Sequence, residues 1–297
     1  MTLTVRAPAK VNLALQVGQR RPDGYHDLTT VFMAVDLFDH VSLDDRSDGR
    51  IAVDIGGEGA ALVPQNGTDL AGRAAALLKA RCGRPDLGAR LVVDKAIPVA
   101  AGLAGGSADA AATLRGCNAL WGLGLADAEL AALAAELGAD VPFSLLGGVA
   151  LGTERGDRLA VLPCLGSYHW VFALAEAGLR TPAVFAEYDR LGLAPAAQPL
   201  TSLVAALADD DQAAVGAALA NDLQPAALSL RPELAETLAT GAARDGVLGA
   251  VLAGSGPTCA FLCASAGAAD EVAASLPSLP QVASTRVARG PAPGATA

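Results

Sequence analysis

The sequence contains very little lysine. Among 297 residues, lysine and arginine together number 21, but the lysines are only Lys10, Lys79 and Lys95. The formal net charge is −10, so the chain as a whole is poorly suited to bind a nucleic acid or an anionic membrane. A site for a phosphorylated ligand must therefore gather its few cations locally. Lys10 and Lys95 each stand beside a proline-marked motif, whereas Lys79 lies in a helical run and is expected to be solvated.

Paired cysteines and metal-binding spacings are also absent. None of the five cysteines forms a Cys-X-X-Cys pair, and an odd number in a chain of this length indicates reduced thiols. Asn12 and Gln16 interrupt the only apolar run near the N-terminus, so no signal-peptide pattern is present. These features predict a cytoplasmic protein and indicate no protein-held metal.

One uncharged run, residues 246–269, is long enough to cross a bilayer. It contains Gly-Ser-Gly-Pro at 254–257, which divides it into two short apolar segments. We therefore predict two buried strands, or a strand and a turn, and no membrane helix.

No Gly-Lys-Ser or Gly-Lys-Thr occurs, so the chain has no P-loop. Instead, a short apolar strand at 91–93 leads to Gly102, Gly105, Gly106 and Ser107, followed by an alanine-rich run. A strand, a glycine-rich loop and a helix N-terminus together present free backbone N–H groups to a phosphate. The residues alone leave a second reading open, a strand-to-helix turn in which glycine only supplies a positive φ.

The remaining pattern predicts an α+β fold in both halves of the chain. Residues 2–6 and 11–17 alternate as strands on either side of a bend at Pro8, and three strand-like runs follow within 28–55. Asp69 is placed to cap a helix over 69–81. Further helices are expected at 107–121, 127–137, 183–190, 201–221 and 231–243, strands at 149–152 and 168–175, and a frayed end at 290–297.

Three blocks together resemble the motifs of the GHMP kinase superfamily. They are Pro8–Asn12, the loop Pro98–Ala108, and Ala253–Pro257. The resemblance implies a two-domain GHMP kinase fold, with an N-terminal ATP-binding domain at 1–155, a C-terminal domain at 156–297, and the active site in the cleft between them.

Two more blocks, Pro22–His26 and Leu137–Pro142, narrow the resemblance to one branch of that superfamily. Its members use ATP to phosphorylate the tertiary 2-hydroxyl of a cytidine-diphosphate-linked methylerythritol, on the non-mevalonate route to isoprenoid precursors. The resemblance implies Mg²⁺ bound with the substrate, no nucleic-acid or membrane partner, and a monomer or homodimer. The alternatives are a homoserine- or mevalonate-type kinase, or a non-catalytic module that binds nucleotides.

The resemblance makes Asp140 and Lys10 the catalytic residues. An aspartate near the acceptor hydroxyl can take its proton, and a lysine beside it stabilises the charged carboxylate. Asp140 also precedes Pro142 as a helix N-cap would, and Lys10 would fit an ordinary surface position. Both alternatives stay open at this point.

The acceptor site is implied to involve aromatic residues. Tyr25 and Phe185 stack on the two faces of the cytosine and His26 hydrogen-bonds its edge, with Tyr25 and His26 exposed after a turn. Phe185 also has helical spacing, which suits core packing. The other implied acceptor contacts are Asn12, Thr181, Pro182, Gly254, Ser255 and Gly256.

The loop is implied to hold ATP, with Ser107 contacting a phosphate oxygen or lying close to Mg²⁺. Ala104 and Ala108 stand where the family commonly has glycine and serine, and Asp69 stands where it often has asparagine. The implied ATP contacts are Pro98, Val99, Ala100, Ala101, Gly102, Leu103, Ala104, Gly105, Gly106, Ser107 and Ala108, with Lys95 and Asp69 near the adenine.

Overall fold

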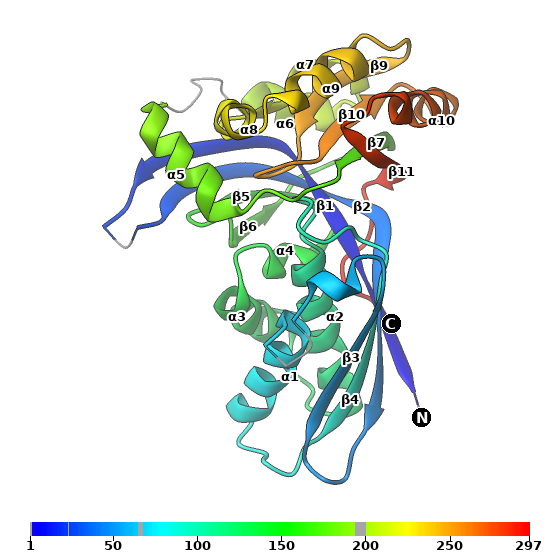
Figure 1. Cartoon of the computed structure of the whole chain (residues 1–297). Coiled ribbons are helices and arrows are strands. Elements are labelled where there is room, and N and C mark those ends of the chain that lie inside the picture. Colours follow the sequence, from blue (N-terminus) through cyan, green and yellow to red (C-terminus); the bar gives the residue numbers. More distant parts are fainter. Residues whose placement is uncertain (1, 23, 65–67, 194–199) are drawn as a thin grey trace.

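Two long antiparallel strands, β1 (Leu3–Arg20) and β2 (His26–Asp45), run through the whole molecule (Figure 1). The computed structural model describes residues 2–22, 24–64, 68–193 and 200–297, so Asp23 of the predicted 22–26 turn lies outside the described residues. The predicted bend at Pro8 does not break the first strand. The register shifts between Pro8 and Ala9, and this irregularity accommodates a residue that cannot donate a ladder hydrogen bond.

The larger sheet has seven strands within the described part of the chain, in the order β3-β4-β2-β1-β8, with β5 pairing to β2 and β6 to β5. Residues 28–55 were expected to form three strand-like runs, but they form only two strands, β2 and β3. The other members are β3 (Ile51–Gly57), β4 (Ala89–Lys95), β5 (Val149–Thr153), β6 (Arg158–Val161) and β8 (Ala220–Asn221).

Three helices, α1, α2 and α4, pack against this sheet, and α3 packs on all three of them, with α2 at the centre of the group (Figure 1). Alanines make α2 thin enough to approach the sheet closely, and Ala108, Ala110 and Ala112 are fully buried. The cap predicted at Asp69 is confirmed, because its side chain accepts a hydrogen bond from the Gly72 N–H at 2.8 Å. The helices are α1 (Leu70–Arg81), α2 (Gly105–Leu120), α3 (Asp127–Leu137) and α4 (Val141–Leu146), with a 3-10 turn η1 (Ala60–Leu62).

A second sheet of four strands, in the order β11-β7-β10-β9, carries the C-terminal helices (Figure 1). The uncharged run folds as predicted, into β9 (Val247–Leu252) and β10 (Cys259–Cys263) joined by a turn. No helix in the described residues is long and apolar enough to span a membrane. The other two strands are β7 (Tyr168–Ala175) and β11 (Val282–Gly290).

The helical stretch predicted at 201–221 is interrupted. Asp210 has a positive φ of 57° between α6 and α7, and the stretch ends as strand β8. The helices of this half are α5 (Thr181–Leu191), α6 (Thr201–Ala208), α7 (Gln212–Ala217), α8 (Gln224–Leu230), α9 (Glu233–Ala242) and α10 (Ala266–Ser275), with the 3-10 turn η2 (Leu276–Ser278).

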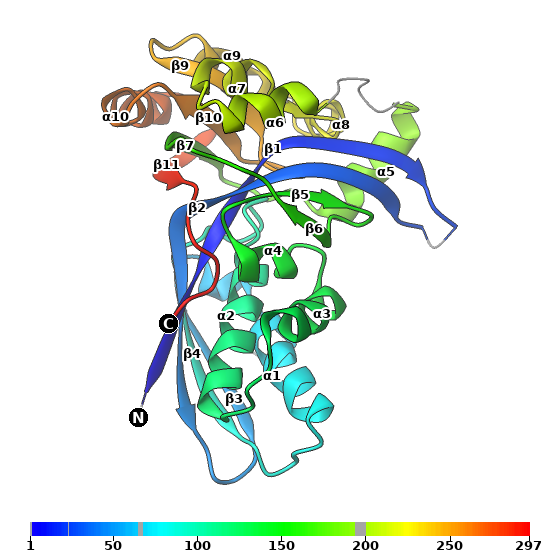
Figure 2. The same ribbon diagram turned by 180° about the vertical axis from the view of Figure 1, so that it is seen from behind.

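The C-terminal end is not frayed, contrary to the prediction. Arg6 and Thr296 exchange two backbone hydrogen bonds of 2.8 and 3.0 Å, and Ala292 and Ala295 are buried. Figures 1 and 2 both show the C-terminal end of the chain beside β1. A Pro/Gly/Ala composition indicates a low propensity for regular secondary structure. It does not reveal that this segment pairs with a strand about 290 residues earlier in the chain.

The mixed sheets and helices confirm the α+β class. The sheets do not separate at residue 155, because β6 and β8 both belong to the larger sheet. The division at 155/156 stays a prediction.

Candidate active site

A cavity of about 1340 Å³ lies where the predicted blocks meet. Residues of β1, the loop before α2, α5 and the 254–255 turn all line it. Segments far apart in the sequence thus share one concave site, which is the usual setting for small-molecule chemistry.

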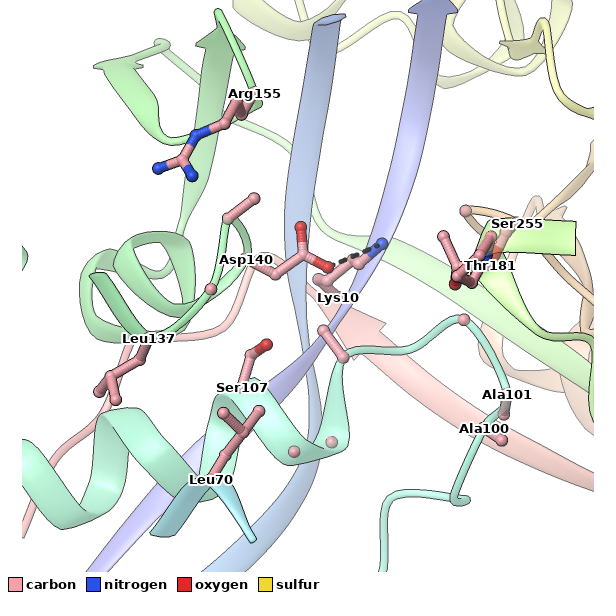
Figure 3. A pocket seen from close by; sticks show the side chains of 18 of the residues that line it. Lys10, Leu70, Ala100, Ala101, Ser107, Leu137, Asp140, Arg155, Thr181 and Ser255 are labelled. Carbon is pink, nitrogen blue, oxygen red and sulfur yellow. Dashed lines mark hydrogen bonds and ion pairs between the residues drawn. The ribbon is translucent and has the colours of Figure 1, made fainter. Parts of the chain in front are cut away.

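Lys10 and Asp140 face each other in this cavity (Figure 3). The Lys10 Nζ lies 3.7 Å from Asp140 Oδ2 and 5.7 Å from the centre of the Phe32 ring. Lys10 is only 5% exposed, so the surface-lysine alternative does not hold. A buried ammonium group beside a carboxylate is a strong local source of positive charge.

Asp140 does not cap the helix that follows it. It occupies the N-cap position of α4, but its side chain makes no cap hydrogen bond and its own backbone is helical, with φ −84° and ψ −13°. The side chain keeps 34% of its surface exposed in the cavity wall. The carboxylate is therefore available for a ligand instead of being used by the helix.

A chain of hydrogen bonds fixes the Lys10 side chain. Its Nζ donates to Asn12 Oδ1 at 2.7 Å, the Asn12 amide donates to Thr30 Oγ1 at 2.8 Å, and Thr30 donates to the Ala14 carbonyl at 2.7 Å. The sequence reasoning missed Thr30, because its role depends on the pairing of β1 with β2. The network orients both Lys10 and Asn12 before any ligand arrives.

The loop before α2 is held tightly against the 253–256 turn. Gly102 has φ +79°, and a Cβ there would lie 2.1 Å from the Ala253 carbonyl oxygen. Gly254 has φ +54° and is less tightly packed, since its own Cβ would lie 3.2 Å from Lys10 Nζ. Only glycine allows these two motifs to meet beside the lysine.

The first turn of α2 opens into the cavity, with Ser107 beside it (Figure 3). Ala104 precedes the helix in the left-handed region, at φ +62°. This conformation explains why glycine is common at the position in the family. Free N–H groups in the first turn of a helix can bind an anion, so this turn is a candidate phosphate site.

Most of the predicted contacts line the cavity, and three do not. Leu103 and Ala108 are fully buried, although the Leu103 carbonyl accepts a 3.2 Å hydrogen bond from the Lys10 N–H. Gly256 lines a smaller neighbouring cavity together with Thr181 and Pro182. The Thr181 and Ser255 hydroxyls are 2.9 Å apart and close one wall (Figure 3).

Lys95 is engaged inside the protein. Its Nζ donates to Asp39 and, at 2.6 Å, to Asp109 Oδ2, while Asp39 Oδ1 accepts from the N–H groups of Ala96 and Ile97. Burial alone would lower the pKa of Lys95, but the charges of Asp109 and Asp39 outweigh it and raise that pKa. The three side chains of Lys95, Asp39 and Asp109 join the end of β4 to α2 beneath the loop. The predicted contact of Lys95 with adenine did not include this cluster.

The opposite end of the cavity carries the aromatic residues. Tyr25 is 61% exposed, but His26 is buried, contrary to the expectation for that turn. The His26 and Phe185 rings stack with centroids 5.2 Å apart, and His26 Nε2 lies 2.8 Å from Asp189 Oδ1. The sequence reasoning missed Asp189, which lies 163 residues from His26 along the chain.

Three arginines that no motif marks also line the cavity: Arg20, Arg73 and Arg155. Arg155 is held by Asp157 and by the Ala135 carbonyl. Their neighbours in the sequence give no sign of this shared position.

Two family models match the chain. Residues 69–148 match the GHMP kinases N terminal domain and residues 203–280 match the GHMP kinases C terminal domain. Among solved structures, homoserine kinase from Cytophaga hutchinsonii superposes with a TM-score of 0.78 at 20% identity, over 99% of this chain and 96% of its own. At that identity the likeness shows the fold alone.

Relatives of higher identity carry one name. Proteins from Nocardia farcinica and Streptomyces coelicolor, both named 4-diphosphocytidyl-2-C-methyl-D-erythritol kinase, are 54% and 53% identical over 98% and 100% of this chain and 94% and 99% of their own. A crystal structure of 4-(cytidine 5'-diphospho)-2C-methyl-D-erythritol kinase matches with a TM-score of 0.79 at 32% identity, covering 97% of this chain and 98% of that one. The chain therefore belongs to the GHMP kinase superfamily and, within it, to the family of 4-diphosphocytidyl-2-C-methyl-D-erythritol kinases.

Proposed function

We propose that the protein transfers the γ-phosphoryl group of ATP to the 2-hydroxyl of 4-diphosphocytidyl-2-C-methyl-D-erythritol, on the non-mevalonate route to isoprenoid precursors. The observation that carries the proposal is the Lys10–Asp140 pair, 3.7 Å apart in a cavity that has a helix N-terminus on one side and an aromatic group on the other. A phosphoryl donor and a base-linked acceptor can occupy these two sides together.

The donor side is the loop and the first turn of α2. The free N–H groups of this turn and the positive end of the helix favour the ATP phosphates. Ser107 adds a hydroxyl at the same place. The adenosine lies toward α1, where Leu70 and Arg73 line the cavity.

The chemistry takes place at Asp140 and Lys10. As the acceptor oxygen forms its bond to the γ-phosphorus and the bond to ADP breaks, the hydroxyl proton passes to the Asp140 carboxylate. The Lys10 ammonium group lies where it offsets negative charge on the transferring group. Asn12 and Thr30 hold Lys10 in place.

The acceptor side is formed by Tyr25, His26 and Phe185. The exposed Tyr25 ring provides a stacking face for the cytosine, and such a contact is worth ~1–3 kcal/mol per base. Phe185 provides the second face and His26 the hydrogen bond to the edge of the base. The Thr181 and Ser255 hydroxyls, with Asn12, line the path to the methylerythritol end.

Mg²⁺ enters the proposal with the nucleotide. Mg²⁺ commonly binds through substrate phosphates and only one or two protein oxygens, so we expect the phosphates to carry most of its ligands. The Ser107 hydroxyl is the protein oxygen that we expect to complete its shell. Bound there, Mg²⁺ would neutralise charge on the phosphates.

We also propose a cytoplasmic location. All five cysteines are free thiols, as expected in a reducing compartment. A monomer or homodimer, without nucleic-acid or membrane partner, stays our prediction.

A panel of acceptors tests the proposed function. We expect ADP release by the purified protein with ATP and the cytidine-linked methylerythritol, and less than about 1% of that kcat/KM with homoserine or mevalonate. Equal turnover of either alternative acceptor would refute the assignment. Nucleotide binding without turnover of any acceptor would favour a non-catalytic module.

A further inference from the structure

The His26 imidazole is held on three sides by one turn of α5. Phe185 stacks on it with an interplanar angle of 25°, and Tyr188 meets it edge-on with centroids 6.0 Å apart. Tyr188 is itself tied to β1, because its hydroxyl donates to the Val17 carbonyl at 3.1 Å. Asp189 completes the enclosure through the 2.8 Å contact with Nε2. The ring is therefore fixed in orientation before a ligand binds.

The Asp189 contact also decides which ring nitrogen carries hydrogen. An ionised carboxylate can only accept, so His26 Nε2 must be the donor. Arg20 Nη1 lies 3.7 Å from the other carboxylate oxygen, Asp189 Oδ2, so this carboxylate has a cationic partner besides His26. An imidazole that donates through Nε2 alone therefore completes the contacts of Asp189.

The second nitrogen, Nδ1, is left for a ligand. Among the described residues no hydrogen bond to His26 Nδ1 is formed, although the side chain is 5% exposed and lines the cavity. In the neutral ring with hydrogen on Nε2, Nδ1 carries a lone pair and can only accept.

We propose that Asp189 is a positioning residue that makes His26 Nδ1 an acceptor and thereby selects cytosine over uracil; the proposal rests on the proposed function. Cytosine presents a 4-amino group, which donates to such an acceptor, whereas uracil presents a 4-oxo group, which accepts. Two acceptors facing each other would leave both buried groups unpaired, and this penalty rejects the wrong base.

The first test measures the ring directly. In ¹⁵N-histidine NMR of the ligand-free protein, we expect His26 as a neutral imidazole with hydrogen on Nε2. The chain has only three histidines, so spectra of H40Q and H169Q assign the signal. Hydrogen on Nδ1, in either the neutral or the cationic ring, would overturn the proposal.

The second test uses Asp189→Asn. The amide can offer Nε2 either its oxygen or its NH₂, so it no longer fixes the tautomer. We expect KM for the cytidine-linked substrate to rise about tenfold, with kcat and the KM for ATP within about twofold of wild type. The preference for the cytidine-linked over the uridine-linked substrate, as a ratio of kcat/KM, should fall at least about tenfold.

Two further variants make the result specific. D189E retains a carboxylate and should recover most of the base preference, and it provides the test if D189N fails to fold. D27N changes an exposed carboxylate of β2 that pairs with Arg21 outside the cavity, and it should retain the full preference. A parallel loss for both substrates in D189N would mean that Asp189 only supports the fold, and it would overturn the proposal.

Failure of the proposed function gives a different result. In that case the wild-type protein turns over neither base-linked substrate, whereas failure of this inference leaves wild-type turnover intact and the base preference of D189N unchanged. The NMR measurement needs no turnover at all.

Discussion

Lys95 joins two carboxylates, Asp39 and Asp109, beneath the loop that precedes α2. One lysine cannot neutralise both, and Asp109 Oδ1 has no hydrogen-bond partner among the described residues. Burial raises the pKa of Asp109 to about 7, despite the opposing charge of Lys95. The folded protein therefore keeps Asp109 protonated at pH values at which a free aspartate would be ionised.

This shift predicts a pH-dependent stability. The unfolded chain loses the Asp109 proton near pH 4, whereas the folded protein keeps it until about pH 7. Between these values the folded state binds more protons, so its stability falls as the pH rises through this window. Asp109→Asn cannot ionise and avoids this loss. We compare the unfolding temperature of this variant with that of the wild type at each pH. We expect the difference, variant minus wild type, to be at least about 3 °C larger at pH 8 than at pH 5.

Thermal unfolding followed by circular dichroism at several pH values measures this difference. A constant difference between the two proteins across the range would show that Asp109 does not titrate there.

Single residues were predictable where a motif marks them. Lys10 and Asp140 follow from two blocks, but the choice between helix cap and available carboxylate for Asp140 needed its backbone angles and its missing cap bond. Thr30 and Asp189 carry no local mark. Each acts on a partner reached only through strand pairing or through the docking of α5 on the β1–β2 hairpin.

At the scale of elements, the strand–loop–helix unit was predictable, because glycine and alanine strongly constrain local conformation. The residues at which elements begin and end were less predictable. The bend at Pro8 became an irregularity within β1, because pairing with β2 continues on both sides of it. The long helical stretch at 201–221 was cut by Asp210, where the chain takes a positive φ.

The loop predicts a difference between two glycine substitutions. Gly102→Ala adds a Cβ 2.1 Å from the Ala253 carbonyl oxygen, in addition to the strain of φ +79°. Gly122 has a similar φ of +60°, but a Cβ there meets nothing within 4 Å. We expect G122A to cost about 1 kcal/mol of unfolding free energy and G102A about 3 kcal/mol or more.

Urea denaturation measures both costs. G102A should also raise the KM for ATP, because its loop must move away from the turn at 253–256, and G122A should not. Equal costs for the two variants would contradict the close contact between the loop and this turn.

At the scale of the whole molecule, the cavity brings together residues from both ends of the chain and from its middle. The α+β class followed from the sequence pattern, but the return of the C-terminal segment to β1 did not. Long-range pairing of this kind depends on which distant segments meet in the fold, and the composition of a segment does not show this. The same limit applies to the cavity, whose lining residues come from distant parts of the chain and surround Lys10 and Asp140.

The central claim is that the two sides bind donor and acceptor independently, while Asp140 takes the proton between them. The most direct measurement is the kcat of Asp140→Asn, together with equilibrium binding of ATP and of the cytidine-linked substrate. We expect kcat to fall about 10²–10⁴-fold, with both dissociation constants within about threefold of wild type. The matched variant D127N, at an exposed aspartate of α3 paired with Arg115, should keep full activity. Undiminished turnover by D140N, with both ligands still bound, would contradict the account.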